Sequence, residues 1–204
     1  MHVPDGLSMD QAASATDAGM TSYSALFRIG QATADMNIGI IGIGGLGQFA
    51  LRAAVAKGFE NVYAADVSEQ ARALAEEIGA KKVVDDVKKL KDKELDLIVD
   101  YAGFGVTTSD ALQTVKAGGT VVLVGMGRLE TTIETFDFIT GGKRLLANVG
   151  GTKEDIADLY ELMASGKLEP KLTEIKFEDI PDGIQQLKEG KVQGRLVAVY
   201  DGNE

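Results

Sequence analysis

Cysteine is absent from the 204 residues of this chain, and so is tryptophan. Without thiols, the chain can form neither a disulfide framework nor thiolate metal ligands. Long apolar runs are absent too, because stretches such as residues 95–99 and 120–124 fall far below the roughly 20 residues needed to span a bilayer. The amino terminus also lacks a basic stretch followed by an apolar segment. These absences predict a soluble, cytoplasmic protein that does not enter a membrane.

Positive charge is scarce in the chain. It has 21 lysines and arginines against 31 aspartates and glutamates, which gives a formal net charge of −10. Such a charge repels phosphate backbones and argues against a general nucleic-acid binder. The lysines of residues 88–93 are interleaved with acids and are read as an ordinary solvated helix or loop face. The hydrophobic content of 45% suffices for one well-filled core.

Strand-like and helical patterns alternate along most of the chain. Ser8 is a plausible N-cap for a helix over residues 9–15, and a second helix is expected at residues 18–29. From residue 37 the texture changes to a β-branched run that stops in a glycine cluster, followed by an amphipathic helix at residues 46–57. Further strands are expected at residues 61–65, 82–84, 95–101, 120–124 and 144–149, with helices at residues 68–78, 107–115 and 153–164. Strands that alternate with helices predict an α/β fold with a doubly wound parallel sheet.

The last forty residues do not extend this pattern in an obvious way. They predict a strand at residues 173–177, a helix at 180–188 and a final strand at 195–200. We therefore divide the chain into a helical lead-in at residues 1–36, a central α/β domain at 37–164 and a carboxyl-terminal segment at 165–204.

The sharpest motif is a glycine turn, Gly42-Ile-Gly44-Gly45-Leu46-Gly47, between a predicted strand and a predicted helix. Gly42 permits the tight turn, Gly44 lets the backbone approach a pyrophosphate, and Gly47 allows the helix to pack closely on the strand. The anion then lies at the positive end of the helix. In this context the motif indicates a dinucleotide-binding (Rossmann) domain.

An acid closes the next predicted strand. Asp66 follows Gly47 by nineteen residues, the place where a carboxylate accepts hydrogen bonds from the ribose hydroxyls and repels a 2′-phosphate. This predicts NAD(H) rather than NADP(H). Asp66 can also belong, with Ser68, to the N-cap region of the following helix, and both roles can hold together.

Short landmarks along nearly the whole chain resemble the zinc-containing alcohol dehydrogenase branch of the medium-chain dehydrogenase/reductase superfamily. They are VPDGL from Val3, DAGMTSY from Asp17, the glycine turn, IGA from Ile78, Gly118-Gly119, Val124-Gly125 and Gly194-Arg195. The resemblance implies that Thr21 lies near the nicotinamide, Val67 near the adenine, and Arg195 at the pyrophosphate. It also places Ala102 and Gly103 beside the ribose region, Val124, Gly125 and Met126 along the nicotinamide, and Asn148 and Val149 at its flank.

The resemblance also concerns zinc. Asp17 stands where the family commonly has a catalytic zinc ligand, and zinc accepts aspartate oxygen. A catalytic site needs about three protein ligands, whereas His2 is the only histidine of the chain. A solvated or helix-capping carboxylate is therefore the simpler interpretation of Asp17, and we expect no zinc in this chain.

By the same resemblance, the chain begins near the end of the family's amino-terminal catalytic domain. The remaining zinc ligands, the proton-relay hydroxyl and the substrate pocket are expected in that domain. Residues 1–36 and 165–204 would be the segments that normally pack against it. We therefore interpret the chain as the NAD(H)-binding part of a truncated zinc-type alcohol dehydrogenase, binding the cofactor without appreciable alcohol oxidation.

Two alternatives stay open on the sequence alone. One is a non-enzymatic NAD-responsive module that acts through a partner protein. The other is a fragment of an NADPH quinone or enoyl reductase, against which Asp66 argues. For assembly the resemblance implies a homodimer through the edge strand at residues 144–149, and an unpaired apolar edge makes such pairing physically reasonable.

Overall fold

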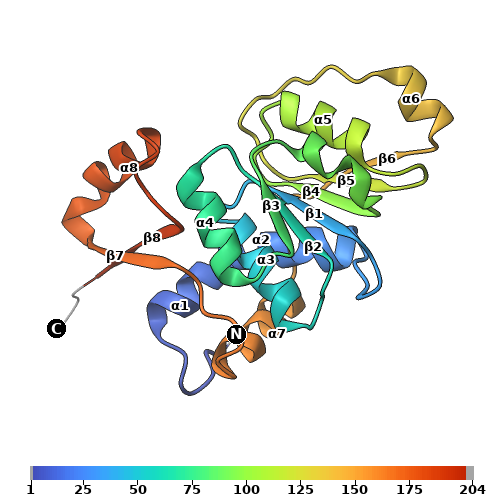
Figure 1. Ribbon diagram of the computed structural model, residues 1–204. Coiled ribbons are helices and arrows are strands. Elements are labelled where there is room, and N and C mark those ends of the chain that lie inside the picture. Colours follow the sequence, from blue (N-terminus) through green and yellow to red (C-terminus); the bar gives the residue numbers. More distant parts are fainter. Residues whose placement is uncertain (1, 201–204) are drawn as a thin grey trace.

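The computed structural model describes residues 2–200, and its centre is a six-stranded parallel sheet in the order β3-β2-β1-β4-β5-β6 (Figure 1). Register is continuous, since Ile38 pairs with Val62 on one side and with Leu97 on the other. The strands are β1 (Ile38–Ile41), β2 (Val62–Ala65), β3 (Lys82–Val84), β4 (Leu97–Asp100), β5 (Thr120–Leu123) and β6 (Arg144–Ala147). The prediction of a parallel α/β sheet is confirmed.

Helices cover both faces of this sheet. On one face α3 (Gly47–Ala56) and α4 (Glu69–Ile78) pack on Ile38 and Ile40. On the other, α5 (Val106–Thr114) and the 3₁₀ segment η3 (Val87–Lys93) pack on Ile41 and its neighbours. Because successive strand residues point to opposite faces, a short apolar strand such as β1 contributes to two separate cores.

The amino-terminal helices form one run rather than two separate pieces. α1 (Met9–Ser14), η1 (Ala15–Gly19), α2 (Met20–Tyr23) and η2 (Ser24–Ile29) follow each other directly, and η1 and η2 are π-helical. Within the run, the Ser22 hydroxyl contacts the Ala18 carbonyl at 2.5 Å and the Leu46 carbonyl at 2.8 Å. The run packs against α7 (Lys153–Ala164) and α3 in a third apolar cluster. No helix within residues 2–200 is long and apolar enough to cross a membrane.

The carboxyl-terminal segment builds a small unit of its own. β7 (Leu172–Lys176) and β8 (Arg195–Val199) pair in parallel, with the 3₁₀ turn η4 (Phe177–Asp179) and α8 (Ile180–Lys188) between them. Figure 1 shows this unit set apart from the six-stranded sheet. The strands and helix expected here are confirmed, whereas the short helix α6 (Thr135–Thr140) before β6 was not expected.

Candidate functional site

The glycine turn joins β1 to α3, and each glycine in it meets different surroundings. Gly42 has a φ of +86°, which favours glycine because a side chain there is strained. A Cβ on Gly47 would lie 1.9 Å from the Gly42 carbonyl oxygen, whereas a Cβ on Gly44 would meet nothing within 4 Å. The turn is therefore closed on its inner side at Gly47 and open to the outside at Gly44.

The helix that follows presents its positive end at this opening. α3 has ten residues, and Leu46 at its N-cap provides no side-chain hydrogen bond. The first amides of a helix lack intrahelical partners, and the helix dipole favours negative charge there. An anion at Gly44 and Gly45 would thus meet backbone donors with no competing side chain from the N-cap residue.

Asp66 is fixed by two backbone amides at the end of β2. One carboxylate oxygen accepts a hydrogen bond from Ile43 N at 2.7 Å, and the other accepts one from Ser68 N at 2.8 Å. Ser68 in turn caps α4 by accepting from Ala71 N. Arg72 donates to the carbonyl oxygens of Asp66 and Val67. The acid thus braces both the glycine turn and the start of α4.

A first cavity of about 520 Å³ opens beside this acid at the carboxyl ends of β1, β2 and β4. The sequence-predicted residues Asp66, Val67 and Ala102 line it together with the glycine turn, and Val67 is 87% exposed. Further lining comes from the acids Asp85, Asp86 and Asp110 and the aromatic rings of Tyr101 and Phe104. The cavity thus combines apolar surface with several carboxylates.

A second cavity of about 600 Å³ lies at the carboxyl ends of β5 and β6. Leu46 of the glycine turn lines this cavity as well as the first. The residues predicted near the adenosine and those predicted near the nicotinamide therefore lie on either side of the glycine turn. The predicted residues in this second wall are Asp17, Thr21, Val124, Gly125, Met126, Asn148 and Val149.

Asn148 serves here as a buried connector. Its amide nitrogen donates to the carbonyl oxygens of Thr21 and Gly150, and its carbonyl oxygen accepts from the Ser24 hydroxyl. The side chain thereby holds the helix that carries Thr21 against the end of β6. Val149, the next residue, is 93% exposed at the cavity.

Asp100 is a residue of the site that the sequence reasoning missed. It is fully buried at the end of β4, and its carboxylate accepts from the amides of Ala102 and Gly103 at 3.0 and 2.9 Å. The hydroxyls of two threonines, Thr107 and Thr108, donate to its other oxygen. An acid that ends an apolar strand, with two threonines at the start of the next helix, was the available signal.

Gly103, in the loop after β4, lies in close contact with the loop after β5. Its φ is +61°, and a Cβ there would lie 1.9 Å from the Gly125 carbonyl oxygen. The loop after β4 and the loop after β5 are thus in backbone contact. Asp100 holds the first of these loops through the amides of Ala102 and Gly103.

Tyr101 lies beside Gly47 of the glycine turn and lines the first cavity. Its hydroxyl donates to the Ser22 carbonyl oxygen at 2.9 Å. Burial raises the pKa of Tyr101 well above its ordinary value, since desolvation disfavours the phenolate. The residue is therefore a neutral hydrogen-bond donor over the physiological pH range.

Comparison with known proteins shows which family the chain belongs to. Residues 45–165, more than half of the chain, match the family model described as zinc-binding dehydrogenase. The chain belongs to the zinc-binding dehydrogenase family. An alcohol dehydrogenase of Geobacillus stearothermophilus is 32% identical over 202 residues, which cover 96% of this chain and 59% of that protein. The resemblance stated from the sequence is confirmed.

Solved structures of similar proteins share the fold. The acetophenone reductase of Geotrichum candidum in complex with NAD aligns with a TM-score of 0.89 at 34% identity, over 96% of this chain and 57% of that one. The alcohol dehydrogenase of Aeropyrum pernix aligns with a TM-score of 0.88 at 26% identity, over 98% and 61%. The chain thus spans about three fifths of the length of these zinc-binding dehydrogenase relatives.

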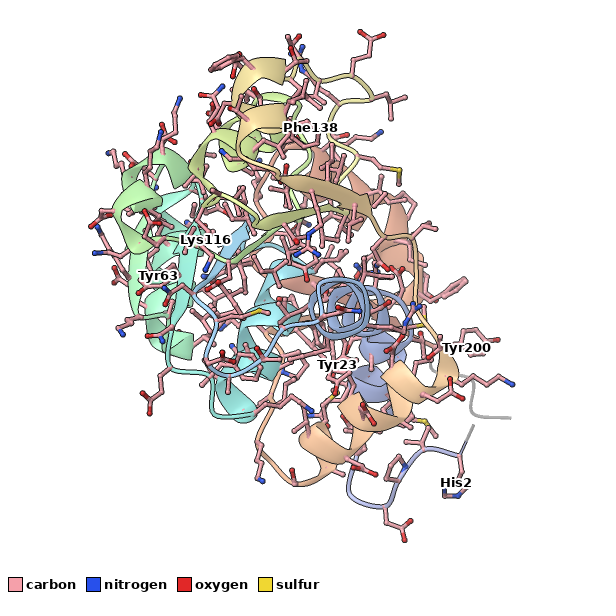
Figure 2. The ribbon with its side chains drawn as sticks, turned by 90° about the vertical axis from the view of Figure 1, so that its right-hand side faces the viewer. His2, Tyr23, Tyr63, Lys116, Phe138 and Tyr200 are labelled. Atoms are coloured by element: carbon pink, nitrogen blue, oxygen red, sulfur yellow. The ribbon has the colours of Figure 1, made fainter. Side chains whose placement is uncertain are left out.

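The residues of this zinc-binding dehydrogenase chain that the structure describes do not fit a zinc site. No three histidine, cysteine, aspartate or glutamate groups gather within residues 2–200. His2 is exposed and lies at the periphery (Figure 2). The Asp17 carboxylate forms an ion pair with the Arg195 guanidinium. Arg195, expected at a pyrophosphate, lies against the glycine turn, 3.5 Å from where a Cβ on Gly45 would be.

Proposed function

We propose that this chain binds NAD(H) and prefers it to NADP(H). The observation that carries the proposal is the glycine turn, open at Gly44 and braced by the Asp66 carboxylate through Ile43 N. A relative aligned over 96% of this chain is a reductase in complex with NAD. The two cavities, both lined by Leu46, suit a ligand with two halves and an anionic centre.

Each half of the cofactor has a candidate seat. The pyrophosphate would lie on Gly44 and Gly45 at the amino end of α3. The adenosine would occupy the first cavity, where Asp66 faces the ribose and Val67 offers apolar surface. The nicotinamide would occupy the second cavity, flanked by Thr21, Val124, Gly125, Met126, Asn148 and Val149.

In a zinc-binding dehydrogenase the nicotinamide supplies the hydride donor and acceptor for alcohol and carbonyl interconversion. We propose this interconversion as the activity of the full-length protein to which a chain of this kind would belong. The residues described here would bind and orient the cofactor. The glycine turn and the two cavities support this role, and no group of three potential zinc ligands gathers within residues 2–200. Rapid alcohol oxidation by the purified chain alone would contradict this division of roles.

The preference for NAD(H) rests on negative charge. A 2′-phosphate would approach the Asp66 carboxylate, with Asp85 and Asp86 on the same cavity wall. Like charges at short range repel, and the cost grows where water is excluded. The 2′-hydroxyl of NAD(H), by contrast, can donate a hydrogen bond to Asp66.

A fluorescence titration with NADH and NADPH tests the proposal. The chain has no tryptophan, so the protein background is low. We expect saturable NADH binding and a dissociation constant for NADPH at least about tenfold higher, which corresponds to about 1.4 kcal/mol. Equal affinity for both cofactors would contradict the specificity, and no binding of either would contradict the function.

Two variants sharpen that titration. Asp66→Asn keeps an oxygen that can accept from Ile43 N but removes the charge, so the NADPH disadvantage should shrink. Asp5→Asn removes the same charge from an exposed residue outside both cavities and should leave the ratio unchanged. A similar shift in both variants would attribute the preference to net charge rather than to Asp66.

For assembly we propose a homodimer through β6. This strand is at the edge of the sheet, and three of its four residues are exposed. The neighbouring α6 exposes Phe136 and Ile139 to 74% and 73%, and apolar surface beside an open strand edge favours association. Light scattering at micromolar concentration should give the dimer mass, and a Leu146→Lys variant should reduce it to the monomer mass.

We keep the cytoplasm as the proposed location. The support is the cysteine-free composition and the lack of long apolar runs in the sequence. Fractionation of cells expressing a tagged chain should recover it with the cytosolic fraction, and recovery with membranes would contradict the proposal.

A further inference from the structure

The ion pair between Asp17 and Arg195 lies at the anion seat. Arg195 begins β8, and its guanidinium is next to the backbone of Gly45. Asp17 belongs to the π-helical segment η1 and lines the second cavity. The pair therefore spans from the glycine turn to the cavity on its far side, over the place where the two halves of a dinucleotide would join.

The pair is accessible to a ligand. The Asp17 side chain is 71% exposed and the Arg195 side chain 31%, so neither charge is sealed in the interior. A guanidinium has several donors in a planar fork and binds phosphate as readily as carboxylate. A pyrophosphate on Gly44 and Gly45 would reach the same guanidinium that Asp17 now holds.

The pair is not needed to attach β8 to the rest of the molecule. The Gln48 side chain, fully buried, makes two hydrogen bonds with the backbone of Lys171, at 3.1 and 2.7 Å. Arg195 N also donates to the Lys171 carbonyl oxygen at 3.1 Å. These bonds fix the strand beside the glycine turn whatever the state of the Arg195 side chain.

We infer that Asp17 is an internal counter-ion that competes with the cofactor's pyrophosphate for Arg195 and so weakens cofactor binding. The inference rests on the proposed NAD(H) binding. Binding of the dinucleotide requires the Arg195 guanidinium to turn from a carboxylate to a phosphate, and the lost ion pair opposes the gained one. Asp17 acts on the cofactor through Arg195, with which it is paired.

The test is a double-substitution cycle with Asp17→Asn and Arg195→Gln, read by NADH fluorescence and by competition with ADP-ribose and with adenosine. Exposed ion pairs contribute up to about 1 kcal/mol, so Asp17→Asn should bind NADH and ADP-ribose about two- to fivefold more tightly. Adenosine, which has no phosphate, should bind unchanged. Arg195→Gln should weaken NADH binding about tenfold or more, because it removes a charged hydrogen-bond donor.

The double variant separates competition from other effects. If Asp17 acts only through Arg195, then Asp17→Asn should have no effect on NADH affinity in the Arg195→Gln background. Asp5→Asn, with the same change in charge, should leave both affinities as they are. Thermal melts of each variant exclude a general loss of folding as the cause.

Several outcomes would overturn the inference. Unchanged or weaker NADH binding by Asp17→Asn would mean that the carboxylate does not compete. The same gain with adenosine would place its effect elsewhere than at the pyrophosphate. Stoichiometric zinc in the wild-type chain that is lost in Asp17→Asn would make Asp17 a ligand. Failure of the wild-type chain to bind NADH would instead refute the proposed function, so the two failures are distinguishable.

Discussion

The six-stranded sheet and the β7–β8 unit are built from the same kind of strand pairing but are buried very differently. Both sheets are parallel and continuous in register. Every residue of β1 and of β4 is buried, whereas no residue of β7 or β8 is. Backbone pairing alone therefore does not decide how well a parallel sheet is stabilised.

The covering layers make the difference. Parallel sheets are normally buried on both faces, and the larger sheet meets this condition with α3 and α4 on one side and α5 and η3 on the other. In the smaller unit α8 packs through Gly183 on Ile175 and Leu196, and large apolar side chains such as Phe177 and Leu187 stay about half exposed. Two strands with so little cover are marginal by themselves, so this unit depends on its attachments to Gln48 and α1.

The largest expected effect comes from truncating one aliphatic side chain in each of the two sheets. Ile40→Ala, in the fully buried β1, should lower the free energy of unfolding by about 2–5 kcal/mol, because it removes buried methyl groups and leaves a cavity. Val197→Ala, in the half-exposed β8, should cost about 1 kcal/mol or less. Urea unfolding of both variants measures the contrast, and equal costs would show that the two sheets are comparably packed.

An intermediate effect is expected from alkaline pH on the free energy of unfolding. Burial raises the pKa of Tyr101 in the folded state, so the folded chain keeps a proton that the unfolded chain loses near the ordinary pKa of 10. Stability is therefore full below about pH 10 and falls above it, by up to about 1.4 kcal/mol per pH unit for this group.

Tyr101→Phe should flatten that fall in urea-unfolding curves between pH 9 and 11. Tyr23 contributes in the same direction, because its pKa is also raised, by burial first and by its hydrogen bond to Asp158 second. A residual slope in Tyr101→Phe is thus expected. A slope identical to that of the wild type would show that Tyr101 ionises freely in the folded chain.

The smallest effect is expected at the surface of the terminal unit. Phe177 and Tyr200 stack edge to face with ring centroids 5.5 Å apart, and both are more than half exposed. Phe177→Ala should cost about 0.5–1.5 kcal/mol and leave NADH binding unchanged. A loss of NADH binding in this variant would show that the packing of the terminal unit, and not only its hydrogen bonds to Gln48, supports the cofactor site.

Periodicity predicted the central sheet well because the signal was local. β1 is a short β-branched run followed by glycines, and α3 has an apolar stripe, so chain order and element type could be read from neighbouring residues. Strand ends were less accurate: the strand expected to run from residue 37 into the glycine cluster spans only Ile38–Ile41. A strand ends where its backbone pairing ends, and β1 pairs with β2 and β4, whose residues are far away in the sequence.

Features that depend on distant partners were not predictable in the same way. The buried role of Asp100 arises from the way its loop meets Thr107 and Thr108. The π-helical segments η1 and η2 were not predicted, because helical spacing indicated only two ordinary helices in this region. The pairing of Asp17 with Arg195 joins positions near the two ends of the chain, and only the folded structure brings them together.

The bond from Ile43 N to Asp66 has a consequence for how cofactor choice can change in descendants of this chain. One carboxylate both repels a 2′-phosphate and supports the turn that would hold the pyrophosphate. A substitution that admits NADP(H) by removing that oxygen also leaves the Ile43 amide without its acceptor, and an unpaired amide is costly. A substitution such as Asp66→Ala would therefore admit the 2′-phosphate but weaken the turn on which the pyrophosphate of either cofactor would lie. Lineages that switch are therefore expected to keep an acceptor at this position, and Asp66→Asn, whose amide oxygen can accept from Ile43 N, is a single substitution that does so.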